Sequence, residues 1–91
     1  MFYTYVLSCT DFKRKKQTFY IGSTSNLDSR KIKHITKGVK STKRFDKIEL
    51  VYYEACLSKK DARKRELQLK TGFGRGYIKK RLEDFLINKR V

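Results

Sequence analysis

Three short segments of aromatic and β-branched residues constrain the fold of this chain more than any other feature of its sequence. They read "FYTYVLSC" at residues 2–9, "FYIG" at residues 19–22 and "IELVYYEAC" at residues 48–56. Each has the length and composition of a β-strand, and the basic loop "TDFKRKKQT" between the first two favours a β-hairpin. Because three such strands are unstable alone, other elements have to cover them.

Helical patterns occur where that cover is needed. The segment "LDSRKIKHITKG" at residues 27–38 follows two possible N-caps, Ser25 and Asn26,. Further helices are predicted within "LSKKDARKRELQLKTG" at residues 57–72 and "YIKKRLEDFLINKR" at residues 77–90,. We therefore predict an α/β fold of the α+β type, with a small three-stranded antiparallel sheet flanked by helices in the order β-β-α-β-α-α.

The first predicted helix carries polar residues next to its apolar face. A helical wheel places Leu27, Ile32 and Ile35 on one arc, which we expect to face the core,. Arg30 and His34 are four residues apart and stack beside that arc, at the border between core and solvent. This border is where the wall of a cleft would lie.

The charge of the chain points to a polyanionic partner. Lysine and arginine number 24 against nine acidic residues, which gives a formal net charge of +15 at pH 7. Such a charge attracts polyanions, so a nucleic acid is the expected partner. An acidic membrane surface is the main alternative, but the strands need a core and the chain has no lipidation motif, so membrane binding is not expected.

The expected compartment is the cytoplasm. The sequence has no run of about 18 apolar residues, and its start lacks the charged and apolar regions of a signal peptide,. Cys9 and Cys56 are isolated at the ends of apolar runs. We expect both cysteines to be reduced core residues and not a disulfide or a metal-binding pair.

Glu66 does not fit the pattern of its helix. It shares a stripe with Ala62 and Leu69, which should face the core,. A buried carboxylate is costly unless it is paired, hydrogen-bonded or coordinating a metal. The residues alone leave two readings open: an ion pair or a solvated end of the stripe, or a metal ligand in a cleft.

Together these residues resemble the signature of the GIY-YIG endonuclease superfamily. The first strand, "YTYVL", supplies Tyr5, and the second, "FYIGST", contains Tyr20-Ile21-Gly22 as the family tripeptide. Arg30 and His34 match the family's helical arginine and histidine, and Glu66 matches the glutamate of its "A…E…LK" helix. The resemblance extends through "ELQLKTG", and it is greatest to small stand-alone members related to the nuclease domains of UvrC and of Slx-type structure-specific nucleases.

Two departures from the family pattern concern the edges of the expected site. The first tripeptide reads Tyr3-Thr4-Tyr5, without the family's glycine and isoleucine, but it keeps the reacting tyrosine. Ser23 follows Gly22 where many relatives carry a lysine. One phosphate contact is therefore expected to be missing or to come from another residue.

The resemblance implies a single GIY-YIG nuclease domain over residues 1–91, a Mg²⁺-dependent endonuclease that hydrolyses phosphodiester bonds of DNA. Glu66 would hold Mg²⁺ or Mn²⁺, hard cations that use few carboxylates. Tyr5 is the expected general base, as a phenolate favoured by nearby cations. Arg30 would bind the scissile phosphate, while Tyr20 and His34 would orient the water or substrate and share in proton transfer.

Other residues are expected to bind the nucleic acid backbone without reading its sequence. Arg75 lies in "TGFGRG", a stretch that is only a weak phosphate-binding signal because it follows a helix,. DNA is favoured over RNA by family analogy alone, in repair, recombination or mobile-element processing, and no small-molecule cofactor is expected. The alternatives are a catalytically weak or inactive nucleic-acid-binding protein with this fold and a basic protein-interaction module. The predicted backbone-binding residues are Gly22, Lys33, Lys43, Arg44, Lys70 and Arg75.

Overall fold

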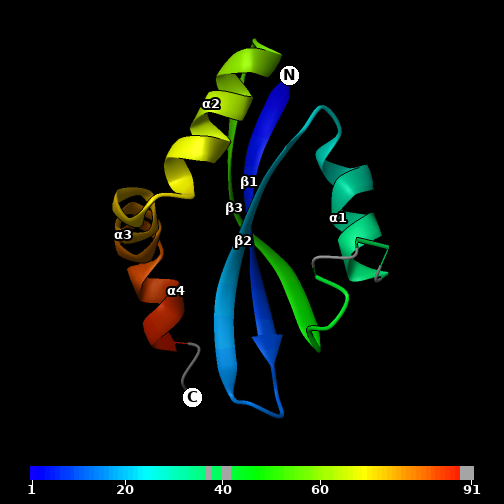
Figure 1. Ribbon diagram of the computed structural model, residues 1–91, viewed down its shortest axis with the longest axis vertical. Helices are drawn as coiled ribbons and strands as arrows, with labels where there is room; N and C mark the ends of the chain where they lie inside the picture. Colours follow the sequence, from blue (N-terminus) through cyan, green and yellow to red (C-terminus); the bar gives the residue numbers. More distant parts are fainter. Residues whose placement is uncertain (37, 40–41, 89–91) are drawn as a thin grey trace.

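A three-stranded antiparallel sheet forms the centre of the molecule (Figure 1). The computed structural model describes residues 1–36, 38–39 and 42–88. The sheet has the order β2-β1-β3, so that β1 is the central strand and β2 is at one edge. This confirms the predicted sheet and its α+β class. The strands are β1 (Phe2–Asp11), β2 (Lys16–Thr24) and β3 (Lys47–Cys56), and the helices are α1 (Leu27–Ile35), α2 (Lys59–Leu69), α3 (Gly72–Arg81) and α4 (Glu83–Asn88).

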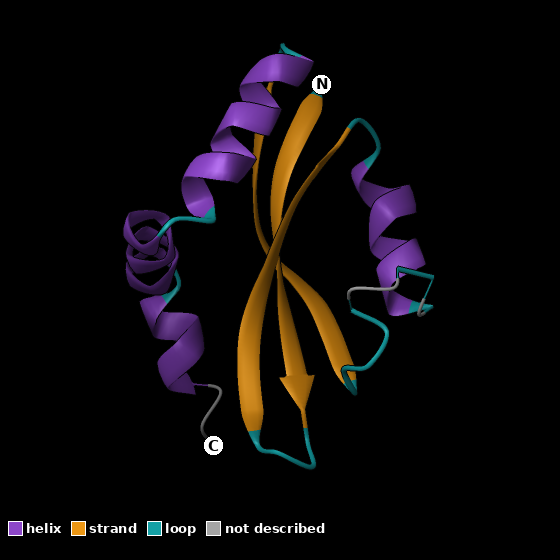
Figure 2. Cartoon of the chain, in the orientation of Figure 1, coloured by secondary structure: helices purple, strands orange, loops and turns teal. Residues whose placement is uncertain are grey.

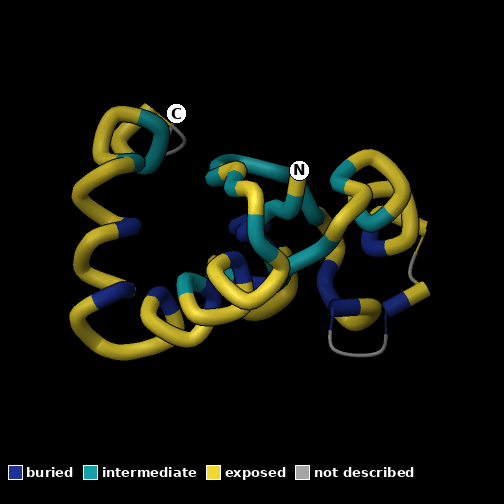
Figure 3. Tube along the Cα trace, turned by 90° about the horizontal axis from the view of Figure 1, so that it is seen from above, coloured by how far each residue is buried: buried dark blue, intermediate teal, exposed yellow. Residues whose placement is uncertain are grey.

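The helices cover both faces of the sheet. Figure 2 shows α1 on one side and α2, α3 and α4 on the other. Because side chains alternate along a strand, β1 contributes to a separate apolar cluster on each side. Figure 3 shows that the buried positions are few along each helix and that most helical positions are exposed. The buried residues are Tyr5, Leu7, Cys9 and Phe45 in one cluster, and Val6, Ile21, Leu69 and Ile78 in the other.

The hairpin between β1 and β2 is longer and its turn is tighter than the sequence predicted. Strand pairing continues to Asp11 and Lys16, so most of the predicted basic loop belongs to the strands. Backbone hydrogen bonds extend the ladder through polar residues because they do not depend on side-chain character. Only residues 12–15 form the turn, where Lys15 has a positive φ of 53°.

Helix α1 is rotated relative to the predicted orientation. Ile32 and Ile35 are 60% and 47% exposed, whereas His34 is completely buried. Leu27 does pack against the core. The prediction failed because it assumed that the apolar residues define the inner face, whereas Arg30 and His34 turn towards the sheet, where Tyr5 hydrogen-bonds to both. The helix also ends before the predicted Gly38, and Lys37, Lys40 and Ser41 of this region lie outside the described residues.

The C-terminal region contains one helix more than predicted. Thr71 caps α3 by accepting a hydrogen bond from the amide of Gly74, so "TGFGRG" opens a helix and does not form a basic turn,. A Cβ at Gly74 would lie 2.3 Å from the carbonyl oxygen of Gln68, which explains the need for glycine there. Helix α3 ends at Leu82, its C-cap, and α4 begins directly after it, so the predicted helix over residues 77–90 is divided in two. Residues 89–91 lie outside the described part.

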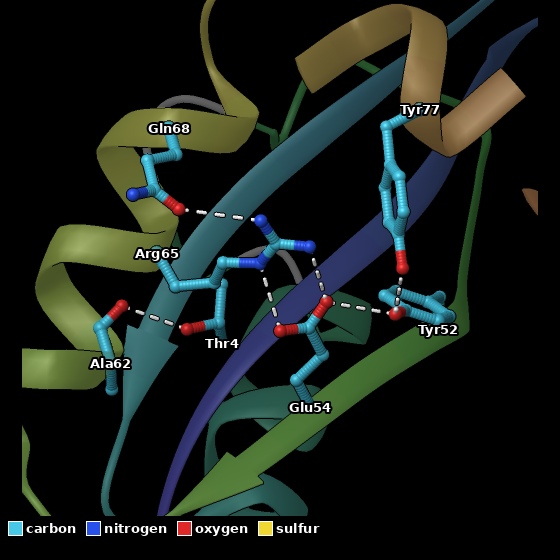
Figure 4. Close-up of polar contacts among 7 residues, drawn as sticks. All are labelled: Thr4, Tyr52, Glu54, Ala62, Arg65, Gln68 and Tyr77. Carbon is cyan, nitrogen blue, oxygen red and sulfur yellow. Dashed lines mark hydrogen bonds and ion pairs between the residues drawn. The ribbon is translucent and has the colours of Figure 1, made fainter.

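A polar network fixes α2 and α3 to β3 (Figure 4). The guanidinium of Arg65 binds both carboxylate oxygens of Glu54, at 2.9 and 3.0 Å. The hydroxyl of Tyr52 donates to Glu54 at 2.8 Å, and Arg65 also lies 5.0 Å from the ring centroid of Tyr77. A bidentate pair of this kind orients as well as stabilises. The network therefore holds α2 and α3 against β3.

Two further predictions concern the sulfur atoms and the membrane. Cys9 and Cys56 are both free thiols; Cys9 is buried in the core as predicted, whereas Cys56 is only half-buried. No described helix has the length and apolar composition needed to cross a bilayer.

Candidate active site

Tyr5 lies at the centre of a hydrogen-bonded cluster between β1 and α1. Its hydroxyl accepts a hydrogen bond from Nε of Arg30 at 3.2 Å and lies 3.1 Å from Nε2 of His34. Arg30 and His34 reach the same oxygen because they are one helical turn apart. Burial raises the pKa of Tyr5, and the hydrogen bond and charge of Arg30 offset this only in part. The cation thus favours the phenolate as expected, but it does not outweigh burial, and in the free protein Tyr5 is a neutral phenol near pH 7.

Tyr20 brings the edge strand β2 into this cluster. Its ring centroid lies 5.0 Å from that of His34 and 6.5 Å from that of Tyr5. The imidazole of His34 is thus in contact with both aromatic rings. Four of the residues predicted from sequence, on three different elements, meet at one place in the fold.

His34 is neutral at physiological pH. Burial, together with the positive charges of Arg30 and Lys33, lowers its pKa to about 4. Its second ring nitrogen, Nδ1, lies 2.8 Å from the hydroxyl of Thr42. Sequence analysis missed Thr42 because it stands in a basic loop with no periodic pattern, where only its neighbours Lys43 and Arg44 carried a signal.

Gly22 makes room for Tyr5. The two residues are direct partners in the β1–β2 pairing. A Cβ at position 22 would lie 2.4 Å from the hydroxyl oxygen of Tyr5 and 2.6 Å from its Cζ, closer than real atoms approach. The glycine therefore has a packing reason in addition to the predicted approach of a phosphate, because the tyrosine crosses directly over it.

Glu66 is buried and paired with hydrogen-bond donors on both oxygens. Oε1 accepts from the hydroxyl of Ser23 at 2.7 Å, and Oε2 accepts from Lys70 and Arg63, each also at 2.7 Å. Burial opposes its ionisation, but the hydrogen bonds from Lys70, Ser23 and Arg63 prevail and lower its pKa. Glu66 is thus an ionised carboxylate with only 5% exposure. The ion pair anticipated as one reading is present.

These pairings are compatible with a metal ligand. A carboxylate has about four lone-pair positions, and three hydrogen bonds leave one of them, on Oε1,. The side chains of Arg63 and Lys70 are 58% and 47% exposed, so solvent is available to them if they leave the carboxylate. Among the described residues, no group of three or more His, Cys, Asp and Glu could hold a metal. A hard cation that keeps most of its waters and uses one carboxylate fits this donor set.

Two consecutive residues of β2 connect Glu66 with the tyrosine cluster. Gly22 lies against Tyr5, and Ser23, on the opposite face of the strand, donates to Glu66,. Figure 1 shows the end of β2 between α1 and α2. The carboxylate of Glu66 and the phenol of Tyr5 therefore lie on opposite faces of the same short stretch of β2. Ser23, which stood out in the sequence only as a missing lysine, is a direct partner of Glu66.

A basic groove runs beside the site. We define the β2–α3 groove by Tyr20, Lys70, Arg75 and Lys79, which line a pocket of ≈ 420 Å³ between these elements. Two of its cations, Lys70 and Arg75, were predicted to contact nucleic acid, and Lys79 was not.

The other predicted contacts lie elsewhere. Lys33 and Lys43 are exposed on α1 and on the loop after it. Arg44 stacks at 4.9 Å over Phe45 and lines a second pocket next to the hairpin turn. The predicted backbone-binding residues thus come from several elements and line two different pockets.

Comparisons with known proteins agree with the geometry. The family model of the GIY-YIG catalytic domain matches residues 1–81. A UPF0213 protein of Staphylococcus haemolyticus is 36% identical over 83 residues, which are 90% of this chain and 94% of that protein. A UPF0213 protein of Natronomonas pharaonis is 39% identical over 70 residues, which are 76% of each chain. No solved structure gives a significant match.

Proposed function

Because the chain belongs to the GIY-YIG family, whose catalytic domain indicates a nuclease, we propose that it is a metal-dependent endonuclease that hydrolyses phosphodiester bonds of DNA. The main support is the arrangement around Gly22 and Ser23 of β2. On one face of this strand lies the phenol of Tyr5, which is hydrogen-bonded to an arginine and a histidine, and on the other face lies the buried, ionised carboxylate of Glu66. Phosphodiester hydrolysis needs an activated water, compensation of the charge on the phosphate and stabilisation of the leaving oxygen.

In this proposal Arg30 binds the scissile phosphate. A guanidinium has five N–H donors in a planar fork, and Arg30 uses its Nε on Tyr5,. The terminal nitrogens can then bind a phosphate while Nε still holds the phenol in position. The phosphate is thereby brought next to Tyr5, which acts as the general base towards the attacking water.

Glu66 holds the metal in this proposal, and a bound Mg²⁺ or Mn²⁺ would supply positive charge at the phosphate and the leaving oxygen. Ser23 orients the carboxylate through its hydrogen bond to Oε1. Lys70 and Arg63 neutralise the carboxylate in the free protein. In this proposal Lys70, which also lines the β2–α3 groove, contacts phosphate when it no longer binds Glu66.

The β2–α3 groove is the proposed path of the nucleic acid. It begins at Lys70, which binds Glu66, and continues past Arg75 and Lys79. Contacts of this kind give affinity without sequence preference. DNA as the substrate and a role in repair, recombination or mobile-element processing rest on the family analogy, whereas a cytoplasmic location stays a prediction from the sequence.

A panel of labelled substrates tests the proposal. Single-stranded DNA, duplex, flap, junction and RNA are incubated with Mg²⁺, with Mn²⁺ and with EDTA. We expect cleavage only with the divalent ions and loss of cleavage in Glu66→Gln, with DNA binding retained. Glu54→Gln is the control, because Glu54 is a half-buried carboxylate that pairs with an arginine, as Glu66 does, but lies in the β3 network. Cleavage by Glu66→Gln at the wild-type rate would remove Glu66 from the mechanism.

One observation favours a second candidate, a nucleic-acid-binding protein with little or no turnover. Both oxygens of Glu66 are already hydrogen-bonded, one of them to two cations. If the cations hold the carboxylate too strongly, a metal cannot displace them. Such a protein would give mobility shifts that weaken with salt but no products with any substrate or metal.

A further inference from the structure

A chain of hydrogen bonds passes through the completely buried imidazole of His34. On one side Nε2 lies 3.1 Å from the hydroxyl of Tyr5, and on the other Nδ1 lies 2.8 Å from the hydroxyl of Thr42. A neutral imidazole carries its proton on one nitrogen and accepts on the other. The partners of Tyr5 and Thr42 therefore decide which nitrogen is protonated.

The surroundings of Tyr5 favour an acceptor at Nε2. The hydroxyl of Tyr5 already accepts a hydrogen bond from Nε of Arg30, and the residue is only 2% exposed. If Nε2 of His34 were protonated, both Nε2 and Nε of Arg30 would donate to the oxygen of Tyr5, and the hydroxyl hydrogen of Tyr5 could not donate to His34. With a lone pair on Nε2, the hydrogen of Tyr5 has an acceptor.

The surroundings of Thr42 lead to the same tautomer independently. Its hydroxyl lies 3.5 Å from the carbonyl oxygen of Val39, to which it can only donate,. Donation to Val39 leaves the oxygen of Thr42 free to accept from Nδ1–H of His34. Thr42 is completely buried, so its hydroxyl has these two partners in place of water.

We propose that Thr42 is a positioning residue that holds His34 in the Nδ1-protonated tautomer, so that the Nε2 lone pair accepts the hydroxyl proton of Tyr5. The resulting order is Arg30 to Tyr5 to His34 to Thr42 to Val39, with each group donating to the next. The catalytic part of this inference rests on the proposed nuclease function, whereas the tautomer does not.

This chain of hydrogen bonds explains how the neutral phenol of Tyr5 can act as a base. An O–H bond of the attacking water breaks as its proton moves to the oxygen of Tyr5, while the Tyr5 proton moves to Nε2 of His34. The hydroxide forms a bond to phosphorus, and the bond from phosphorus to the leaving oxygen breaks. His34 then returns its proton to solvent through Tyr5, and the leaving oxygen takes a proton from solvent. Binding of a phosphate to Arg30 favours the step, because its negative charge offsets the positive charge beside His34.

The tautomer can be measured directly because His34 is the only histidine in the chain. A long-range ¹H–¹⁵N correlation spectrum of the free protein distinguishes a protonated from an unprotonated ring nitrogen. We expect protonated Nδ1 and unprotonated Nε2 in the wild type. Protonated Nε2 in the wild type would overturn the proposal, whether or not the protein cleaves DNA.

Variants at position 42 test the positioning role. Thr42→Val keeps the shape but removes the acceptor, so we expect a shift to the Nε2-protonated tautomer and a loss of roughly 10²-fold in cleavage rate. Thr42→Ser should restore both the spectrum and the rate. Thr36→Val is the control, since within the described part of the chain its hydroxyl donates to backbone carbonyls of α1. An unchanged tautomer in folded Thr42→Val would refute the role of Thr42.

If the wild type cleaves no substrate, the proposed nuclease function fails. The spectra of the wild type and of Thr42→Val would still decide whether Thr42 sets the tautomer.

Discussion

Substitution of Gly22 by alanine should disturb the catalytic cluster without changing any charge. The added Cβ would lie 2.4 Å from the hydroxyl oxygen of Tyr5, 2.6 Å from Cζ and 3.1 Å from Cε1. Tyr5 cannot easily move away, because its ring belongs to the buried cluster with Leu7 and Phe45. Any displacement also lengthens the hydrogen bonds from its hydroxyl to Arg30 and His34.

The expected cost follows from these contacts. Overpacking in a core typically costs about 1–3 kcal/mol, and loss of the two hydrogen bonds of Tyr5 adds about 1 kcal/mol each. The lower entropy of the unfolded chain with alanine returns about 0.5–1 kcal/mol. Gly22→Ala should therefore lower the free energy of unfolding by about 2–4 kcal/mol, which corresponds to a melting temperature lower by roughly 10–20 °C.

Thermal unfolding followed by circular dichroism measures this effect, and the cleavage assay follows the site. Gly76→Ala is the matched control, because nothing lies within 4 Å of a Cβ built there. Alanine in place of this helical glycine should raise stability by about 0.5–1 kcal/mol. A Gly22→Ala protein that melts and cleaves like the wild type would show that Tyr5 does not pack across Gly22.

Three further outcomes are expected. His34 has a lower pKa in the folded chain, about 4, than its ordinary 6.5, so its contribution to stability is complete above pH 6.5 and is lost as the pH falls towards 4. Urea unfolding should show a decrease on the order of 3 kcal/mol over this range, which His34→Gln removes. Gly74→Ala should destabilise the protein by about 3 kcal/mol or more, because the added Cβ meets the backbone of α2, whereas Gly72→Ala should melt near the wild type. Lys79→Ala should weaken DNA binding equally for all sequences and lower the slope of log affinity against log salt by about 1, and an unchanged slope would exclude Lys79 from the path.

The sequence was informative where a residue broke its local pattern. Glu66 on an apolar stripe indicated an ion pair, a solvated stripe end or a metal ligand, and the structure shows the ion pair. The strands were recognisable because aromatic and β-branched residues are concentrated in them. The cluster of Tyr5, Tyr20, Arg30 and His34 came from a family pattern, which carries spatial information that periodicity alone lacks.

The missed features depend on tertiary contacts between polar groups. Helix α1 turns His34 and not Ile32 inwards, and no wheel can predict this because the stabilising partners lie on β1 and in a loop. The predicted helix within residues 77–90 included the second half of α3 but not its start at Gly72, because glycine is a poor helix former,. The close contact of Gly74 with α2 explains why glycine stands at that position. Thr42 had no distinguishing pattern in the sequence, and Ser23 stood out only because many relatives carry a lysine there.

The charge balance around Glu66 links the stability of the fold to its proposed function. Arg63 and Lys70 stabilise the buried carboxylate in the free protein, and Lys70 also lines the β2–α3 groove, the proposed path of the nucleic acid. Removing Lys70 therefore disturbs folding, metal binding and nucleic acid binding together, and its effect on activity cannot be assigned to one of them. Ser23 is the partner that separates these contributions, because Ser23→Ala removes one hydrogen bond to Glu66 and leaves every charge in place. A loss of cleavage in Ser23→Ala with unchanged DNA affinity would thus report on the orientation of the carboxylate alone.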